Sequence, residues 1–88
     1  MSRITYRTEI FSEADLYVAR CPELDVSSFG DTIDEARDSL HEAVEAFLEG
    51  CELLGTLDEI LEESGFENVG GQWRLRQRIL EEATIAIP

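Results

Sequence analysis

The sequence predicts an α+β fold in which a three-stranded antiparallel meander packs on a long amphipathic helix. Three observations support this prediction: apolar and polar residues alternate at the start of the chain, apolar residues follow a helical repeat in the middle, and the alternation returns near the end. At 88 residues the chain has room for one domain, which we expect to span residues 1–88. A domain of this size has a thin core, so we expect self-association into a dimer or larger oligomer.

Three short strands are predicted before the helix. Residues 3–11 alternate between apolar and polar side chains, as in a strand with one buried face. After a polar turn at 12–15, residues 16–21 carry apolar side chains on both faces, which is typical of a central strand. Pro22 interrupts the pattern because proline cannot donate a hydrogen bond to a sheet, and residues 24–29 form the third strand. The short connections favour antiparallel pairing.

A long amphipathic helix follows. Thr32 and Glu35 have the spacing of a capping box, in which each side chain accepts a hydrogen bond from a backbone amide near the other residue. A step of about 100° per residue places the apolar side chains in one arc, which contains Ile33, Ala36, Leu40, Ala43, Val44, Phe47, Cys51 and Leu54. The opposite side carries the acids Asp34, Glu35, Asp38, Glu42, Glu45, Glu49 and Glu52. Gly55 is expected to end this helix.

A short second helix and a C-terminal strand complete the predicted order β-β-β-α-α-β. The segment Thr56-Leu57-Asp58-Glu59 repeats the capping box and is expected to start a helix that extends through Ser64. Residues 68–71 are predicted to form a turn. From Gln72 onward the alternation returns, and residues 83–87 are predicted to be a second stretch of strand.

The charge balance bears most directly on function. Seven arginines, no lysine and twenty acids give a formal net charge of −13. Phosphate backbones and anionic membranes repel such a chain, so direct DNA binding and membrane binding are disfavoured. A field of this sign attracts a basic protein, although the acids could also serve only to keep the chain soluble. The candidate partner-binding residues on the helix are Asp34, Asp38, Glu42, Glu45 and Glu49.

Few residues suit catalysis or a cofactor. One histidine and two distant cysteines do not supply the three or four ligands of a zinc site. His41 is expected on the surface and Cys51 in the core, while Cys21 could be a reactive thiol or a core residue. A metal-dependent nuclease needs carboxylates that converge from rigid elements, whereas Asp15 and Asp25 lie in or beside turns. We therefore predict no catalytic residue, no cofactor and no metal.

The cysteines and the hydropathy predict the compartment. Two cysteines thirty positions apart do not form a secreted disulfide framework, and no stretch is apolar enough for a membrane span or a signal peptide. The simplest expectation is a cytoplasmic protein. The one basic cluster, Arg74, Arg76 and Arg78, is either an anion site or a set of strand arginines that pair with nearby acids.

Two segments resemble the HicB-like antitoxin domain. They are Cys21-Pro22-Glu23-Leu24 and Gly30-Asp31-Thr32-Ile33-Asp34-Glu35-Ala36, and the resemblance covers about residues 3–55. It implies a partly degenerate ribonuclease-H-like fold without catalytic residues, which binds and blocks a small basic toxin that cleaves messenger RNA. Members of that family usually add a C-terminal DNA-binding module, but the segment after Gly55 is too short for one, so we expect no operator binding. The alternative is a solitary, self-associating domain with a different protein partner.

Overall fold

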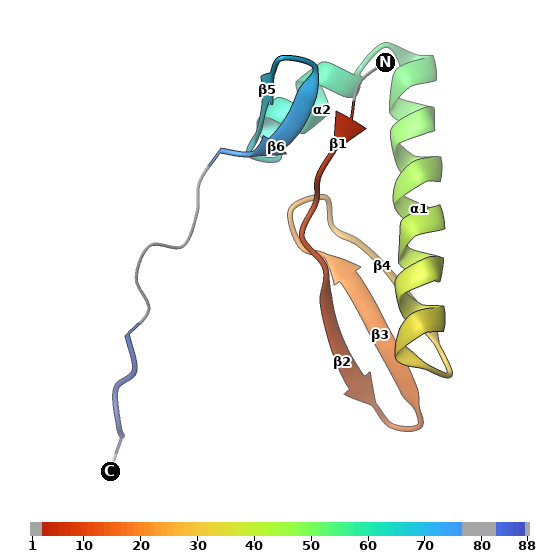
Figure 1. Cartoon of the computed structure of the whole chain (residues 1–88), viewed down its shortest axis with the longest axis vertical. Helices are drawn as coiled ribbons and strands as arrows, with labels where there is room; N and C mark the ends of the chain where they lie inside the picture. The colour runs from red at the N-terminus through yellow and green to blue at the C-terminus, as the bar shows by residue number, and fades with distance from the viewer. Residues whose placement is uncertain (1–2, 77–82, 88) are drawn as a thin grey trace.

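A computed structural model describes residues 3–76 and 83–87 and confirms an α+β architecture (Figure 1). The described part contains two helices and six strands in two small sheets. In chain order the elements are β1 (Arg3–Ile4), β2 (Glu9–Glu13), β3 (Leu16–Cys21), β4 (Val26–Gly30), α1 (Ile33–Leu54), α2 (Leu57–Glu63), β5 (Phe66–Val69) and β6 (Gln72–Leu75). The predicted order therefore lacked two strands, one at each end.

The first sheet has the order β2-β3-β4 and is antiparallel throughout. β3 is central, as its two-sided apolar pattern predicted. β2 continues to Glu13 because only Ala14 and Asp15 are needed for the turn into β3. The third strand begins at Val26 and not at residue 24, because the Asp25 amide donates to the Pro22 carbonyl (3.3 Å) and closes a turn there.

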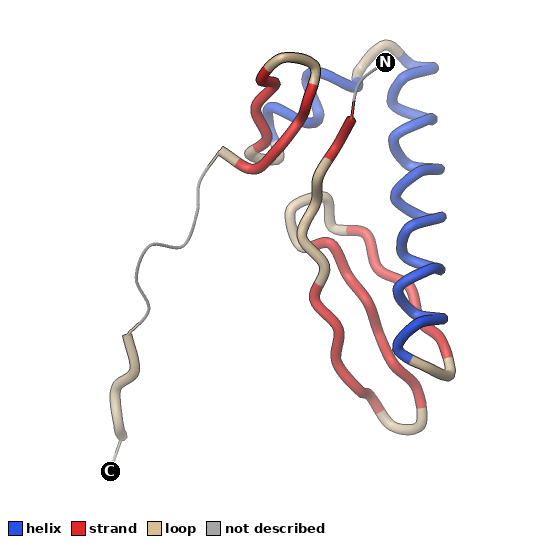
Figure 2. The backbone as a smooth tube through the Cα atoms, viewed as in Figure 1, coloured by secondary structure: helices blue, strands red, loops and turns tan. Residues whose placement is uncertain are grey.

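The second sheet has the order β1-β6-β5, and its outer members lie far apart in the sequence. β1 runs parallel to β6, with Arg3 opposite Gln72, so the predicted strand over residues 3–11 is wrong in its bounds. Its two halves join different sheets, which Figure 2 shows as two separate groups of strands. β5 and β6 form a hairpin around Gly70 and Gly71, whose φ angles of 62° and 86° suit a two-residue turn. The predicted turn over 68–71 was too wide and concealed β5.

The helix α1 packs its apolar stripe on β3 and β4. Its buried residues are Ala36, Leu40, Val44 and Cys51, and the first three meet Ala19 and Cys21 from β3 in one core. Ile33 and Leu54, which were predicted to share this stripe, are 44% and 80% exposed. They are the first and last residues of the helix, and they lie outside the stretch from Ala36 to Cys51 that contains its buried residues.

The core continues beneath the second sheet. Leu61 from α2, Phe66 from β5 and Trp73 from β6 are buried and belong to the same cluster as the residues under α1. The two sheets therefore share one core, with α1 packed on the first sheet and α2 packed on β5 of the second.

The two predicted capping boxes behave differently. At α1 the Thr32 hydroxyl accepts a hydrogen bond from the Glu35 amide (3.0 Å), and the Glu35 carboxylate accepts one from the Asp31 amide (2.9 Å). This box is confirmed, with its second bond shifted by one residue. At α2 the Thr56 side chain makes no capping bond, so the second box is wrong. Gly55, at φ 73°, ends α1 as predicted.

The segment 83–87 is extended but is not part of a sheet. Figure 1 shows it apart from the helices and the other strands, and all five of its residues are exposed. The predicted second stretch of strand is therefore not formed within the single chain. Arg78 and Ile79 lie outside the described residues.

A candidate protein-binding surface on the long helix

The five predicted binding residues form one exposed ridge along α1. Asp34, Asp38, Glu42, Glu45 and Glu49 are all exposed. At about 100° per residue they fall within an arc of about 80° on the side opposite the buried stripe. We call this set the acidic ridge. The structure thus brings together the residues that the helical repeat placed together.

Positive charge is scarce near the acidic ridge. Residues 34–63 contain eleven of the twenty acids but only one of the seven arginines, Arg37. Arg37 pairs with Asp34 (2.9 Å) one turn away, and His41 with Glu45 (2.7 Å). Among the described residues, Asp38, Glu42 and Glu49 have no ion-pair partner. These carboxylates are available to a basic partner.

The remaining arginine pairs among the described residues lie in or beside the sheets. Arg7 contacts Glu23 (2.9 Å) and Glu9, and Arg20 contacts Glu9 (3.4 Å). The hydrogen bond that the exposed Arg7 donates to the Glu23 carboxylate raises the pKa of Arg7. The negative charge of the chain is therefore concentrated on the helices, while Glu9 and Glu23, in and beside the first sheet, are paired with arginines.

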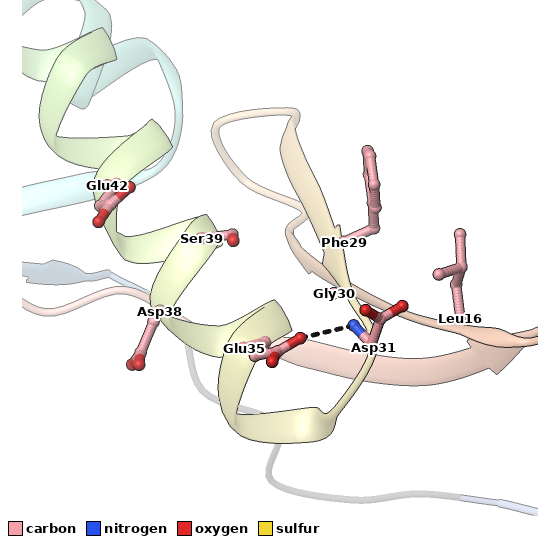
Figure 3. Close-up of a pocket in the computed structure, with 8 residues that line it drawn as sticks. All are labelled: Leu16, Phe29, Gly30, Asp31, Glu35, Asp38, Ser39 and Glu42. Atoms are coloured by element: carbon pink, nitrogen blue, oxygen red, sulfur yellow. Dashed lines mark hydrogen bonds between the residues drawn. The ribbon is translucent and has the colours of Figure 1, made fainter.

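A shallow hollow of about 340 Å³ lies on one flank of the acidic ridge, next to β4 (Figure 3). We call it the β4 groove. Leu16 and Phe29 supply its apolar side, and the helix side is formed by Glu35, Asp38, Ser39 and Glu42. Figure 3 shows Glu35 turned toward the Asp31 amide, so the capping bond forms the end of the groove.

A larger hollow of about 750 Å³ lies on the other flank. Ser39 of the β4 groove and Leu48 of this second hollow are nine residues apart, which is about 180° around the helix axis. We call the second hollow the β1 groove, since Ile4 of β1 lines it. Its lining combines three apolar side chains with four carboxylates: Ile4, Leu48, Leu57, Glu45, Glu49, Glu52 and Asp58. The acidic ridge thus separates two grooves of mixed apolar and acidic character.

Sequence reasoning identified the acids but missed the apolar side chains beside them. Leu48 lies off the apolar stripe, at the border of the acidic side, and this displacement was the one local signal of a groove. Ile4 and Leu57 come from other elements, so no helical repeat could have placed them there.

His41 joins the helix to the segment that links β1 and β2. Its Nδ1 atom lies 3.1 Å from the Tyr6 hydroxyl oxygen, its Nε2 atom contacts Glu45, and the Tyr6 and His41 rings stack at 6.3 Å between centroids. Burial, with a smaller contribution from Cys21 and Glu45, raises the pKa of Tyr6. His41 is exposed as predicted, and it also fixes the wall of the β1 groove through Glu45.

The other chemically active residues are accounted for by structural roles. Cys21 and Cys51 are both buried, and burial raises the pKa of the Cys21 thiol, which disfavours a reactive thiolate at neutral pH. Arg74 lies 3.9 Å from Glu67, and the Arg76 guanidinium donates to the Phe66 carbonyl (3.1 Å). These contacts favour the structural interpretation of the arginine cluster.

Neither a metal cluster nor a membrane-spanning helix is found in the described part of the chain. Within residues 3–76 and 83–87, no three His, Cys, Asp or Glu side chains are grouped so that they could hold a metal ion. Among the described helices, none is both long and apolar enough to cross a bilayer; α1 has the length but carries acids along one side.

The fold and the surface define an acidic α+β domain whose most distinctive feature is a carboxylate ridge between two partly apolar grooves. Comparison with models of protein families, with curated proteins and with solved structures gives no match to this chain.

Proposed function

We propose that this chain is an antitoxin-like protein, which binds and neutralises a small basic toxin that cleaves messenger RNA. The observation that carries the proposal is the β1 groove beside the acidic ridge, where three apolar side chains lie among four carboxylates. A basic protein with an apolar anchor next to its arginines or lysines complements such a surface.

The two kinds of side chain have separate roles in this proposal. Burial of Ile4, Leu48 and Leu57 against the partner supplies most of the binding free energy, because desolvated apolar contacts at the centre of an interface dominate affinity. The carboxylates accelerate encounter with a basic partner and disfavour other partners. Glu49 and Glu52 have no ion-pair partner among the described residues, so the new contacts displace no arginine.

The resemblance to the HicB-like antitoxin domain supports the same proposal from the sequence. One of its two most specific segments, Gly30 to Ala36, builds the capped start of α1 and so positions the acidic ridge. The antiparallel sheet beneath a long helix is compatible with the degenerate ribonuclease-H-like fold that the resemblance implies. We extend the proposal to that fold and to the absence of a catalytic role.

The test combines recovery of the partner with a charge-matched comparison. The protein is used to pull down partners from source-cell lysate, and any small basic protein recovered is assayed for ribonuclease activity with and without it. The association rate is then measured at low and moderate salt for Glu45→Gln/Glu49→Gln/Glu52→Gln and for Glu13→Gln/Asp15→Asn/Asp25→Asn. Both variants lose three negative charges, but only the first alters the β1 groove.

We expect the recovered protein to be inhibited on rebinding. The groove variant should associate at least about tenfold more slowly at low salt and with a weaker salt dependence, while the control variant should change less than about threefold. Equal slowing of both variants would show that only net charge matters. A basic protein whose ribonuclease activity is unaffected by binding would contradict the antitoxin role.

A further inference from the structure

The uncharged edge of the first sheet and the exposed C-terminal segment are complementary. We propose that residues 83–87 of one copy of this chain add as a strand to the β4 edge of a second copy. The inference does not depend on the proposed function, because it does not use the β1 groove; of the acidic ridge, only Asp38 and Glu42 line the β4 groove beside this contact.

β4 is an edge strand without the usual protection. Among the described residues it pairs only with β3, so its other side presents backbone N–H and C=O groups without a strand partner. Natural edge strands are commonly protected from pairing with other chains by charged side chains, and the opposite edge, β2, carries Glu9 and Glu13. β4 contains no charged residue, and its Phe29 is 64% exposed.

An apolar row leads to this edge on the sheet face that α1 does not cover. Phe11, Val18 and Phe29 lie opposite one another across the three strands. Ile10 and Ala19, the neighbouring pair, face the helix and belong to the core, so the alternation of side chains places the row on the outer face. A strand added at β4 would extend the row beyond Phe29.

The segment 83–87 has the composition of the missing strand. It reads Ala-Thr-Ile-Ala-Ile, without charge, and Ile85 and Ile87 are 84% and 88% exposed. In an extended chain these two isoleucines point to one side, and Thr84 and Ala86 point to the other. Docked at β4, the isoleucines pack beside Phe29 on the apolar side of the β4 groove, while the two smaller side chains face its helix side; the groove has a volume of about 340 Å³.

Charge selects this contact for two copies of the same chain. Each copy carries −13, so surfaces that include the acidic ridge repel one another. The β4 strand and residues 83–87 are both uncharged, so the paired strands themselves bring no like charges together. The carboxylates on the helix side of the β4 groove, Glu35, Asp38 and Glu42, face an uncharged segment in this contact. If each copy gives its segment and receives the other, the contact is two-fold symmetric and closed.

The mass of the full chain in solution tests the inference, measured by sedimentation over a range of concentrations. The test variant is Ile85→Asp/Ile87→Asp, and the control is Leu53→Asp/Leu54→Asp, which introduces the same charge at two exposed apolar positions on α1. We expect a dimer whose dissociation constant rises at least about tenfold in the test variant and less than about threefold in the control, because burying unpaired charges is costly. Added salt should strengthen the dimer by screening the repulsion, whereas it should weaken binding of a basic partner.

A cross-linking experiment locates the contact and separates exchange between copies from docking within one chain. The variants Ser28→Cys and Ala86→Cys are purified separately, mixed and oxidised; a disulfide between the two chains supports the inference. A cross-link that forms only when both cysteines are in one chain would show that the segment docks on its own sheet and would overturn it. A dimer that is unaffected by Ile85→Asp/Ile87→Asp, or a monomer at all concentrations, would overturn it as well.

Discussion

The two helices begin with nearly the same four residues, yet only one of them is capped. Thr32-Ile33-Asp34-Glu35 starts α1, and Thr56-Leu57-Asp58-Glu59 starts α2. The Thr32 hydroxyl accepts from the Glu35 amide, whereas the Thr56 hydroxyl points backward and donates to the Cys51 carbonyl (3.4 Å). The threonine of the first motif therefore caps the start of α1, whereas the threonine of the second bonds to the end of the same helix.

The backbone that enters each motif explains the difference. Thr32 follows a strand and has the extended conformation (φ −129°, ψ 164°) that directs its side chain at the first free amides of the helix. Thr56 comes directly after the left-handed Gly55, and its own amide donates to the Cys51 carbonyl (2.9 Å), which holds it at ψ 6°. A capping box needs an extended backbone at its threonine. Thr56 directly follows the C-cap of α1 and does not have that conformation.

The largest expected effect comes from the strand that approaches Thr32. In Gly30→Ala the new Cβ would lie 2.6 Å from the Ala36 nitrogen and 2.8 Å from the Glu35 carbonyl carbon, which are backbone atoms that cannot move aside. We expect a loss of at least about 2 kcal/mol in the free energy of unfolding, measured by urea denaturation.

Gly50→Ala is the matched control for this change. A Cβ at Gly50 meets nothing within 4 Å, so alanine should be neutral or should stabilise α1 by up to about 1 kcal/mol. Similar losses in both variants would mean that β4 does not closely approach the start of α1.

A smaller effect is expected from the cap itself. Thr32→Ala removes the acceptor for the Glu35 amide and should cost about 1 kcal/mol, while Thr32→Ser keeps the hydroxyl and should cost much less. Urea denaturation of the three proteins measures both differences. Equal stability of Thr32→Ala and Thr32→Ser would show that the hydroxyl does not cap the helix.

The smallest effect is expected at the second motif. Thr56→Ala removes only a long hydrogen bond to a carbonyl that also accepts from the Thr56 amide, so the loss should stay below about 0.5 kcal/mol. The same urea denaturation measures this difference. If Thr56→Ala lowered the free energy of unfolding as much as Thr32→Ala, the two threonines would stabilise the protein equally, and the backbone difference between them would not matter.

Local signals were sufficient to predict the central part of the fold. The cap at Thr32, the apolar repeat and Gly55 together defined both ends of α1, because each acts within a few residues of its own position. The same repeat placed the acidic ridge. The pairing of β1 could not be predicted, since its partner lies about seventy positions away and alternation alone does not name a partner.

Other errors have a similar origin. The segment 83–87 alternates like a strand, but a strand also needs a neighbour, and the single chain offers it none within the described residues. The two grooves escaped prediction because Ile4, Leu16, Phe29 and Leu57 join the helix only through tertiary packing. Local sequence patterns therefore predict the elements but not which strands pair or which side chains pack together.

The parallel pairing of β1 with β6 has a consequence for how the protein is made. Arg3 and Ile4 leave the ribosome early, but their partners Gln72 and Trp73 are synthesised after both helices. The first sheet and α1 need only residues 9–54, so this unit can collapse while translation continues. Closing so long a loop is entropically costly and slow. We therefore expect the first residues synthesised to be among the last to form their native strand pairing.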